Sequence, residues 1–89
     1  MNIKKLDKNR IEIINKDYVF YILKEKNPGT KKDIGKQLYF YFLDIFQNKY
    51  NEYREVYDRE IFNEIENCID YIKNNYTLDN SIINKIKFK

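Results

Sequence analysis

Several residue types that carry chemistry are missing or nearly missing from this sequence. It has no His and no Trp, one Cys, one Pro and two Gly. Without His there is no Ser-His-Asp or Cys-His pair and no Cys/His zinc site, and two Gly are too few for a glycine-rich phosphate loop. These absences exclude many of the common nucleophilic, zinc-dependent and nucleotide-dependent chemistries.

The length leaves room for one domain. A chain of 89 residues builds at most one small hydrophobic core. Its residues are 43% hydrophobic and 17% aromatic, which is too apolar for a disordered tail. We therefore expect a single folded domain over residues 1–89, with residues 1–9 and 86–89 frayed at its ends.

The composition points to an unusual genome. Ile, Asn, Lys and Tyr together fill 49 of the 89 positions, and the codons of all four are rich in A and T. This bias predicts a gene from an AT-rich bacterium, phage or plasmid.

The compartment follows from the single cysteine and the charged start of the chain. Cys68 has no partner for an internal disulfide, and its place in an apolar stripe favours a reduced thiol packed as a small hydrophobe. The N-terminus lacks the apolar run of a signal peptide. The longest nearly apolar run, residues 38–46, would span about 13 Å as a helix, against roughly 30 Å for a bilayer core. We expect a cytoplasmic protein.

The N-terminal third predicts a β-hairpin. Residues 10–14 and 18–23 are rich in β-branched and aromatic side chains, and residues 15–17 are Asn, Lys and Asp, of which Asn and Asp tolerate left-handed turns. The alternative is one helix over residues 8–25, because short apolar runs do not separate strands from helices.

Two long helices are predicted next. Pro28 and Gly29 suit the centre of a type II turn, and Thr30 followed by Asp33 has the spacing of a capping box, so a helix should begin near Lys31. Its apolar stripe is Ile34, Leu38, Tyr41, Phe42 and Ile45. Apolar residues also occupy a second side, Tyr39, Leu43, Phe46 and Tyr50, so we expect the helix either to be buried centrally or to be covered on that side by a partner.

The second long helix is predicted over residues 53–76. Its apolar positions recur every three or four residues: Tyr53, Tyr57, Ile61, Ile65, Cys68, Ile69, Ile72 and Tyr76. A short helix through Ile82, Ile83 and Ile86 should close the chain. The predicted fold class is thus α+β, an N-terminal β-hairpin followed by two long helices and a short C-terminal helix; the alternative is an all-α bundle.

Catalysis is the weakest functional interpretation. Glu60 with Glu64, and Glu66 with Asp70, place carboxylates one helical turn apart, but on the wet face of the predicted helix. Cys68 has no His to activate it. We expect no enzyme activity, no cofactor and no metal.

Protein binding is the favoured interpretation. Nine Tyr and six Phe exceed what so small a core encloses easily, and Tyr is enriched at interfaces. The predicted partner-binding residues combine Tyr with carboxylates: Tyr50, Glu52, Tyr53, Glu55, Tyr57 and Asp58. We expect a non-enzymatic binding protein that blocks a protein or ribonucleoprotein partner. Anti-defence inhibitors such as anti-CRISPR proteins, and immunity proteins, have a comparable size and composition.

Two alternatives remain from other classes. A small nucleic-acid-binding regulator would use the clustered lysines Lys24, Lys26, Lys31, Lys32 and Lys36. A structural homodimer would use the second apolar side of the first long helix, through Tyr39 or Leu43.

Overall fold

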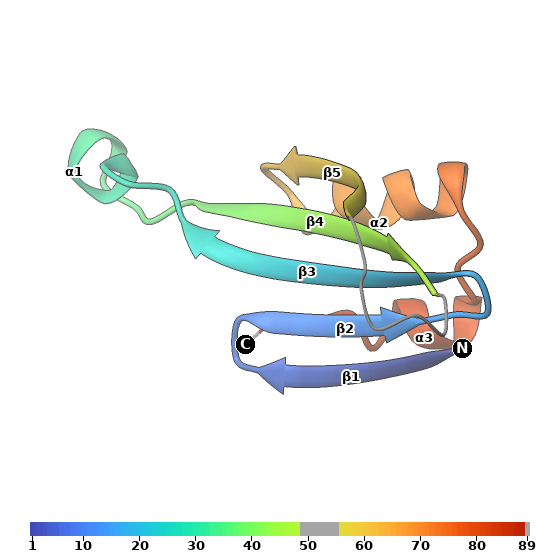
Figure 1. Ribbon diagram of the computed structural model, residues 1–89. Helices are drawn as coiled ribbons and strands as arrows, with labels where there is room; N and C mark the ends of the chain where they lie inside the picture. The colour runs from blue at the N-terminus through green and yellow to red at the C-terminus, as the bar shows by residue number, and fades with distance from the viewer. Residues whose placement is uncertain (49–55, 89) are drawn as a thin grey trace.

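The fold is an antiparallel sheet whose five strands follow one another in chain order. The structure is a computed structural model that describes residues 1–48 and 56–88. Each strand pairs with the next along the chain (Figure 1). The strands are β1 (Asn2–Asp7), β2 (Arg10–Ile14), β3 (Tyr18–Lys26), β4 (Tyr39–Gln47) and β5 (Val56–Phe62). The helices are α1 (Thr30–Ile34), α2 (Ile65–Asn75) and α3 (Asn80–Ile83).

The predicted fold class is wrong, because the two long helices do not exist. Residues 39–47 and 56–62 are strands, and α1 is only five residues long. Gly35, with a φ of +79°, follows the last residue of α1, and such a left-handed residue commonly terminates a helix. The run that begins at Tyr39 is rich in aromatic residues, which suit a pleated sheet when both of its faces are apolar. The all-α alternative and the description of the protein as helical are wrong for the same reason.

The strand pair expected over residues 10–23 is present. β2 pairs antiparallel with β3, from Arg10 opposite Leu23 to Ile14 opposite Val19. The connection differs from the expected left-handed turn, since no described residue other than Gly has a positive φ. Instead, the Asn15 side-chain oxygen accepts hydrogen bonds from the backbone N–H groups two and three residues ahead, at 2.9 and 2.5 Å. This Asx-type arrangement turns the chain without a glycine.

The turn at Pro28 and Gly29 is confirmed, but the capping box is wrong. The Thr30 N–H donates to the Asn27 carbonyl at 3.4 Å, and Gly29 has the φ of +84° that a type II turn requires at its third position. The Thr30 hydroxyl does not cap the helix. It accepts a hydrogen bond from the Leu38 N–H at 2.9 Å and so joins the two ends of the α1 segment.

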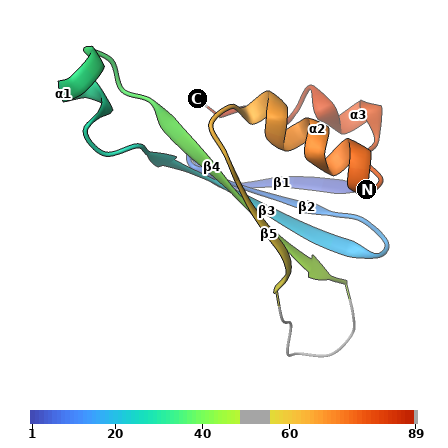
Figure 2. The ribbon, with the colours of Figure 1, turned by 90° about the horizontal axis from the view of Figure 1, so that it is seen from above.

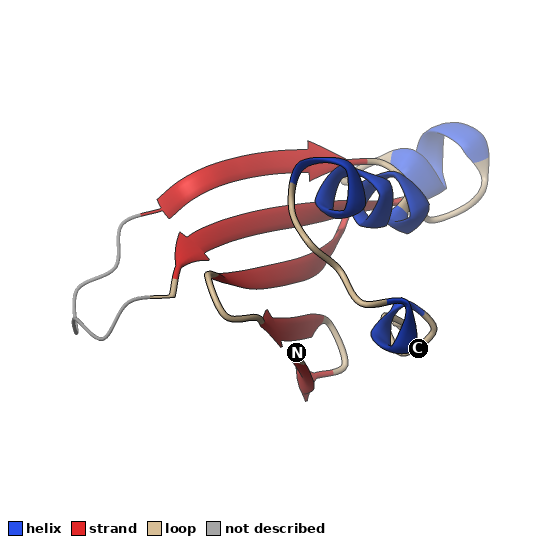
Figure 3. Cartoon of the chain, turned by 90° about the vertical axis from the view of Figure 1, so that its right-hand side faces the viewer, coloured by secondary structure: helices blue, strands red, loops and turns tan. Residues whose placement is uncertain are grey.

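The C-terminal third packs on one side of the sheet. Figures 2 and 3 show α2 and α3 on the same side. Residues 65–75 form the back half of the expected second helix, and Cys68 and Ile72 are its buried positions. β1 begins at Asn2, and Ile86 is only 3% exposed.

A single core lies between the sheet and these helices. Burial of each large apolar side chain there contributes roughly 1.5–3 kcal/mol. The buried core residues are Ile11, Ile13, Phe20, Ile22, Leu43, Ile45, Cys68, Ile72, Ile82 and Ile86. Within the described ranges, no helix is long and apolar enough to span a membrane.

Candidate functional site

The predicted partner-binding residues are only partly within the described structure. Tyr50, Glu52, Tyr53 and Glu55 lie outside the described residues. Tyr57 and Asp58 belong to strand β5 rather than to a helix. Tyr57 is 54% exposed and is available to a partner.

A bulge in β5 places Tyr57 and Asp58 on the same side of the sheet. Asp58 pairs with Ile45, while Val56 pairs with Phe46, so Tyr57 is an extra residue between the two pairs. Neighbouring residues of a regular strand point to opposite faces, but an extra residue re-aims its side chain. Both side chains therefore lie on the helix-covered side.

Asp58 holds two tyrosines of the helix layer against the sheet. The hydroxyls of Tyr71 and Tyr76 both donate to Asp58 Oδ2, the second at 3.1 Å. The Tyr18 ring lies 4.8 Å from the Tyr76 ring and 5.4 Å from the Tyr57 ring. This tyrosine cluster, Tyr18, Tyr57, Tyr71 and Tyr76 around Asp58, fastens α2 to β5. Sequence reasoning missed Tyr18, Tyr71 and Tyr76, because their convergence depends on strand pairing.

The environment of the cluster keeps its phenols protonated. The hydrogen bond to Asp58 and burial raise the pKa of Tyr71 to about 12. Burial, followed by the hydrogen bond to Asp58, raises the pKa of Tyr76 further. At neutral pH both hydroxyls act as hydrogen-bond donors and not as bases or nucleophiles. The described contacts give Asp58 a structural role, and its role in partner binding stays a prediction.

These pKa values predict a loss of stability in alkali. An unfolded Tyr ionises near pH 10, below the folded-state pKa, so the stabilisation is complete below pH 10 and is lost as the pH rises toward about 12. We expect the melting temperature of the wild type to fall more steeply between pH 10 and 12 than that of the double variant Tyr71→Phe and Tyr76→Phe. Thermal melts followed by circular dichroism measure this. The control Tyr39→Phe lies away from Asp58 and should follow the wild type; equal slopes for all three proteins would contradict the prediction.

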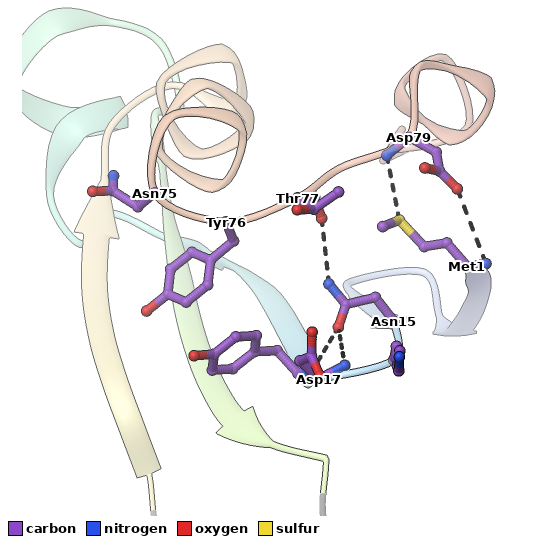
Figure 4. Close-up of a pocket in the computed structure, with 9 residues that line it drawn as sticks. Met1, Asn15, Asp17, Asn75, Tyr76, Thr77 and Asp79 are labelled. Atoms are coloured by element: carbon purple, nitrogen blue, oxygen red, sulfur yellow. Dashed lines mark hydrogen bonds and ion pairs between the residues drawn. The ribbon is translucent and has the colours of Figure 1, made fainter.

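A pocket of about 430 Å³ lies beside the cluster, at the end of the sheet (Figure 4). The Asn15 side-chain amide donates to the Thr77 carbonyl at 3.3 Å, and the Asp79 N–H lies 3.4 Å from the Met1 sulfur. The first contact attaches the α2–α3 connection to the β2–β3 loop, and the second attaches it to the N-terminal residue. The lining residues are Met1, Asn15, Lys16, Asp17, Tyr18, Asn75, Tyr76, Thr77 and Asp79.

The opposite side of the sheet carries a second apolar surface. In β4, Leu43 and Ile45 are fully buried in the core, so alternation directs Phe42, Asp44 and Phe46 to the other side. Among the described residues, no helix lies on that side (Figures 2 and 3). We call it the open face. Its partly or fully exposed apolar members are Ile14, Tyr21, Leu23, Phe40, Phe42, Phe46, Val56 and Ile61, and Val19 on the same side is buried at 1% exposure.

The open face is organised in rows that cross the strands. The strand register aligns one charged row, Lys4, Glu12, Tyr21, Asp44 and Arg59. One apolar row beside it contains Ile14, Val19, Phe46 and Val56, and the other contains Leu23, Phe42 and Ile61 next to Arg10.

Contacts within the open face keep its side chains ordered. The Tyr21 and Phe46 rings meet edge to face at 5.6 Å, and the Phe40 and Phe42 rings lie 6.1 Å apart. Arg59 Nε donates to Asp44 Oδ1 at 2.6 Å. Ile61 is 56% exposed and Val56 40% exposed. Exposed aliphatic side chains beside ordered aromatic rings and a salt bridge are typical of a protein-binding surface.

The lysines of the nucleic-acid alternative are gathered at one end of the molecule. Lys24 and Lys26 lie at the end of β3, Lys31 and Lys32 are in α1, and Lys36 lies between α1 and β4. The structure thus brings this predicted set together on the β3–β4 connection.

Of the two carboxylate pairs predicted from helical spacing, only Glu66 and Asp70 lie on a helix. Glu60 lies in β5, where its Oε1 is 3.5 Å from the Tyr71 hydroxyl, and Glu64 immediately precedes α2. Glu66 and Asp70 are exposed on α2. No group of three or more potential ligands among the residues that the structure describes could hold a metal ion.

Comparisons with known proteins give this chain no relatives. No protein-family model matches it, and neither the curated proteins nor the solved structures contain a significant match. Its function must therefore be inferred from its own surfaces.

Proposed function

We propose that this chain is a non-enzymatic, cytoplasmic binding protein that blocks a partner macromolecule with the open face. One observation carries the proposal: the sheet is apolar on both sides, and the described helices cover only one of them. Aromatic rings and exposed aliphatic side chains on a side that the described helices do not cover are typical of an interface. The lone, buried thiol of Cys68 suits a reducing compartment.

The charges of the open face favour a protein over nucleic acid. Its charged row contains Glu12 and Asp44 as well as Lys4 and Arg59, and Arg59 is already paired with Asp44. A phosphate backbone would meet two carboxylates near the centre of this surface and be repelled. A partner protein whose surface has an apolar patch with both positive and negative side chains could pack on the apolar rows and pair with the charged row.

The same row disfavours a second copy of the chain. Its charges read positive, negative, Tyr, negative, positive across the sheet. When two copies pack face to face around a two-fold axis along or across the strands, Lys4 meets Lys4 or Arg59, and Glu12 meets Glu12 or Asp44. Like charges would oppose one another in both arrangements. The predicted homodimer contact through the first long helix cannot form, because that helix is absent from the fold and Leu43 lies in the core.

The biological setting of the proposal rests on the composition. The excess of Ile, Asn, Lys and Tyr supports an AT-rich bacterial, phage or plasmid origin. A small blocking protein of such origin fits an anti-defence or immunity role, by analogy of size and composition.

The test is crosslinking from matched positions on the two sides of the molecule. Replacement of Ile61 by p-benzoylphenylalanine in the native host should give a nuclease-resistant adduct of one discrete mass, whereas the same replacement of Asn67, exposed on α2, should not. With that partner purified, Ile61→Glu should weaken binding more than about tenfold, which corresponds to about 1.4 kcal/mol, and Asn67→Glu should change it less than twofold.

Three results would contradict the proposal. They are equal adducts from both positions, an adduct with twice the mass of the chain itself, and equal weakening by the two charge-matched variants. Circular dichroism of each variant confirms that it is folded before binding is measured.

A further inference from the structure

A basic arm projects from the sheet at the end opposite the tyrosine cluster. The arm comprises residues 24–39, the end of β3, α1 and the start of β4 (Figures 1 and 2). The last β2 pair on β3 is at Leu23, and the last β5 pair on β4 is at Tyr41. Beyond them the strand pairs join only β3 and β4, as a two-stranded ribbon that carries α1 at its tip, and the Lys24 N–H at its base donates to the Asn9 carbonyl at 2.8 Å.

Side-chain hydrogen bonds hold the tip of the arm in one shape. The Thr30 hydroxyl donates to the Asn27 carbonyl at 3.0 Å and accepts from the Leu38 N–H at 2.9 Å. The Gln37 amide donates to the carbonyls of Leu38 and Asn27 at 2.7 and 3.1 Å. The lysines of the arm are therefore attached to an ordered backbone and not to a loose loop.

The net charge of the whole protein resides in this arm. Its five lysines and two acids give +3, which equals the net charge of the complete chain. The remaining residues carry twelve basic and twelve acidic side chains and are neutral as a set. Positive charge that is concentrated on a projecting element attracts polyanions to that element rather than to the rest of the surface.

The base of the arm is hollowed between basic side chains. Lys8 from the β1–β2 turn joins Lys24 and Lys26 around a hollow of about 580 Å³. Lys24 Nζ lies 4.2 Å from the centre of the Tyr39 ring, which orients it by a cation–π contact. Among the described residues, Glu25 is the one acid that lines the hollow. Cations thus extend from the base of the arm to its tip.

We propose that the arm binds the phosphate backbone of a double-stranded nucleic acid without reading its sequence. Lys supplies point charges that suit phosphates, and the arm contains no Arg, the side chain that most often reads base edges. A two-stranded ribbon also has the width that a major groove admits. An anionic membrane is disfavoured, because the exposed large aliphatic side chains of the arm are only Ile34 and Leu38 among the described residues.

This proposal is independent of the proposed function, because the arm and the open face are altered by different substitutions. The test measures binding of the purified chain to a 20-base-pair DNA duplex of random sequence, and to an RNA duplex of equal length, between 50 and 200 mM salt. Binding to vesicles that contain anionic lipid is measured separately. The variant is Lys32→Glu with Lys36→Glu, both exposed. The control is Lys73→Glu with Lys85→Glu, which makes the same change in net charge on the helix layer.

We expect the arm variant to bind a duplex at least tenfold more weakly, and the control less than threefold more weakly. The slope of log affinity against log salt should fall by about 2 in the arm variant, one for each lost phosphate contact. Absence of duplex binding by the wild type, binding to vesicles alone, or equal losses in both variants would each overturn the proposal.

Discussion

Leu43→Lys is expected to abolish the folded state, whereas Phe42→Lys should leave it folded. The two residues are neighbours in β4 and point to opposite sides of the sheet. Leu43 has no exposed surface and packs in the core. A buried Lys there loses the apolar contacts and must be desolvated, at more than about 4 kcal/mol, which is comparable with the whole stability of roughly 5–10 kcal/mol expected for a domain of this size. Phe42 lies on the open face, where a Lys reaches water, so the expected loss is about 1–2 kcal/mol.

Urea unfolding followed by circular dichroism distinguishes the two variants. Phe42→Lys should retain the strand signal and a cooperative transition, and Leu43→Lys should show neither. Comparable destabilisation by both substitutions would mean that alternation between the faces is not as described. The comparison also separates the strand from the helix that the apolar spacing predicts, in which Phe42 lies on the main apolar stripe and Leu43 on the second side.

Cys68 is expected to react with thiol reagents only when the protein unfolds. Its side chain is fully buried in α2, and burial raises its thiol pKa from 9.0 to about 12. At pH 8 this shift alone lowers the thiolate fraction about a thousandfold, and the packing also blocks access by the reagent. In native buffer, reaction with a chromogenic disulfide reagent should take at least a thousand times longer than in denaturing urea, where one thiol should react per chain.

A matched exposed cysteine controls for the reagent. Ser81→Cys combined with Cys68→Ala places a single thiol at an exposed position of α3. This variant should react at similar rates in the presence and absence of urea. Native Cys68 reacting as fast as Cys introduced at position 81 would contradict its burial, and with it the packing of α2 on the sheet.

Local signals in the sequence located several elements correctly. Pro28 and Gly29 mark the turn, because both impose backbone conformations that do not depend on distant residues. The strand pair over residues 10–23 follows from two β-branched runs separated by polar turn residues. Residues 65–75 form a helix at the predicted three- and four-residue spacing, and Cys68 is the small buried hydrophobe expected there.

The prediction of a first long helix is wrong because its apolar pattern has two interpretations. Residues 39–46 are apolar at nearly every position, so three- and four-residue steps can be found in them as easily as alternation. In the structure, Leu43 and Ile45 face the helices while Phe42 and Phe46 face the open side. The predicted second side does not match the open face, because Leu43, one of its members, lies in the core, and Phe42, from the main stripe, lies on the open face.

One of the candidate surfaces can be recognised in the sequence, and the other two cannot. The five lysines of the arm are close together in the chain, so the sequence alone reveals their clustering. The open face draws residues from all five strands, and the tyrosine cluster joins Tyr18 to Tyr71 and Tyr76 across more than fifty positions. No local pattern reveals either.

By itself, then, the sequence determined the strand pair over residues 10–23, the turn at Pro28 and Gly29, the helix over residues 65–75, and the absence of imidazole. Tertiary structure alone decided that residues 39–47 and 56–62 are strands and which of their side chains are covered. The physical reason is that a strand gains its hydrogen bonds and much of its packing from segments that are distant in the sequence. Whether an apolar segment of this length becomes a strand or a helix therefore depends on the strands that pair with it. A turn or an amphipathic helix, in contrast, makes its defining contacts within a few residues.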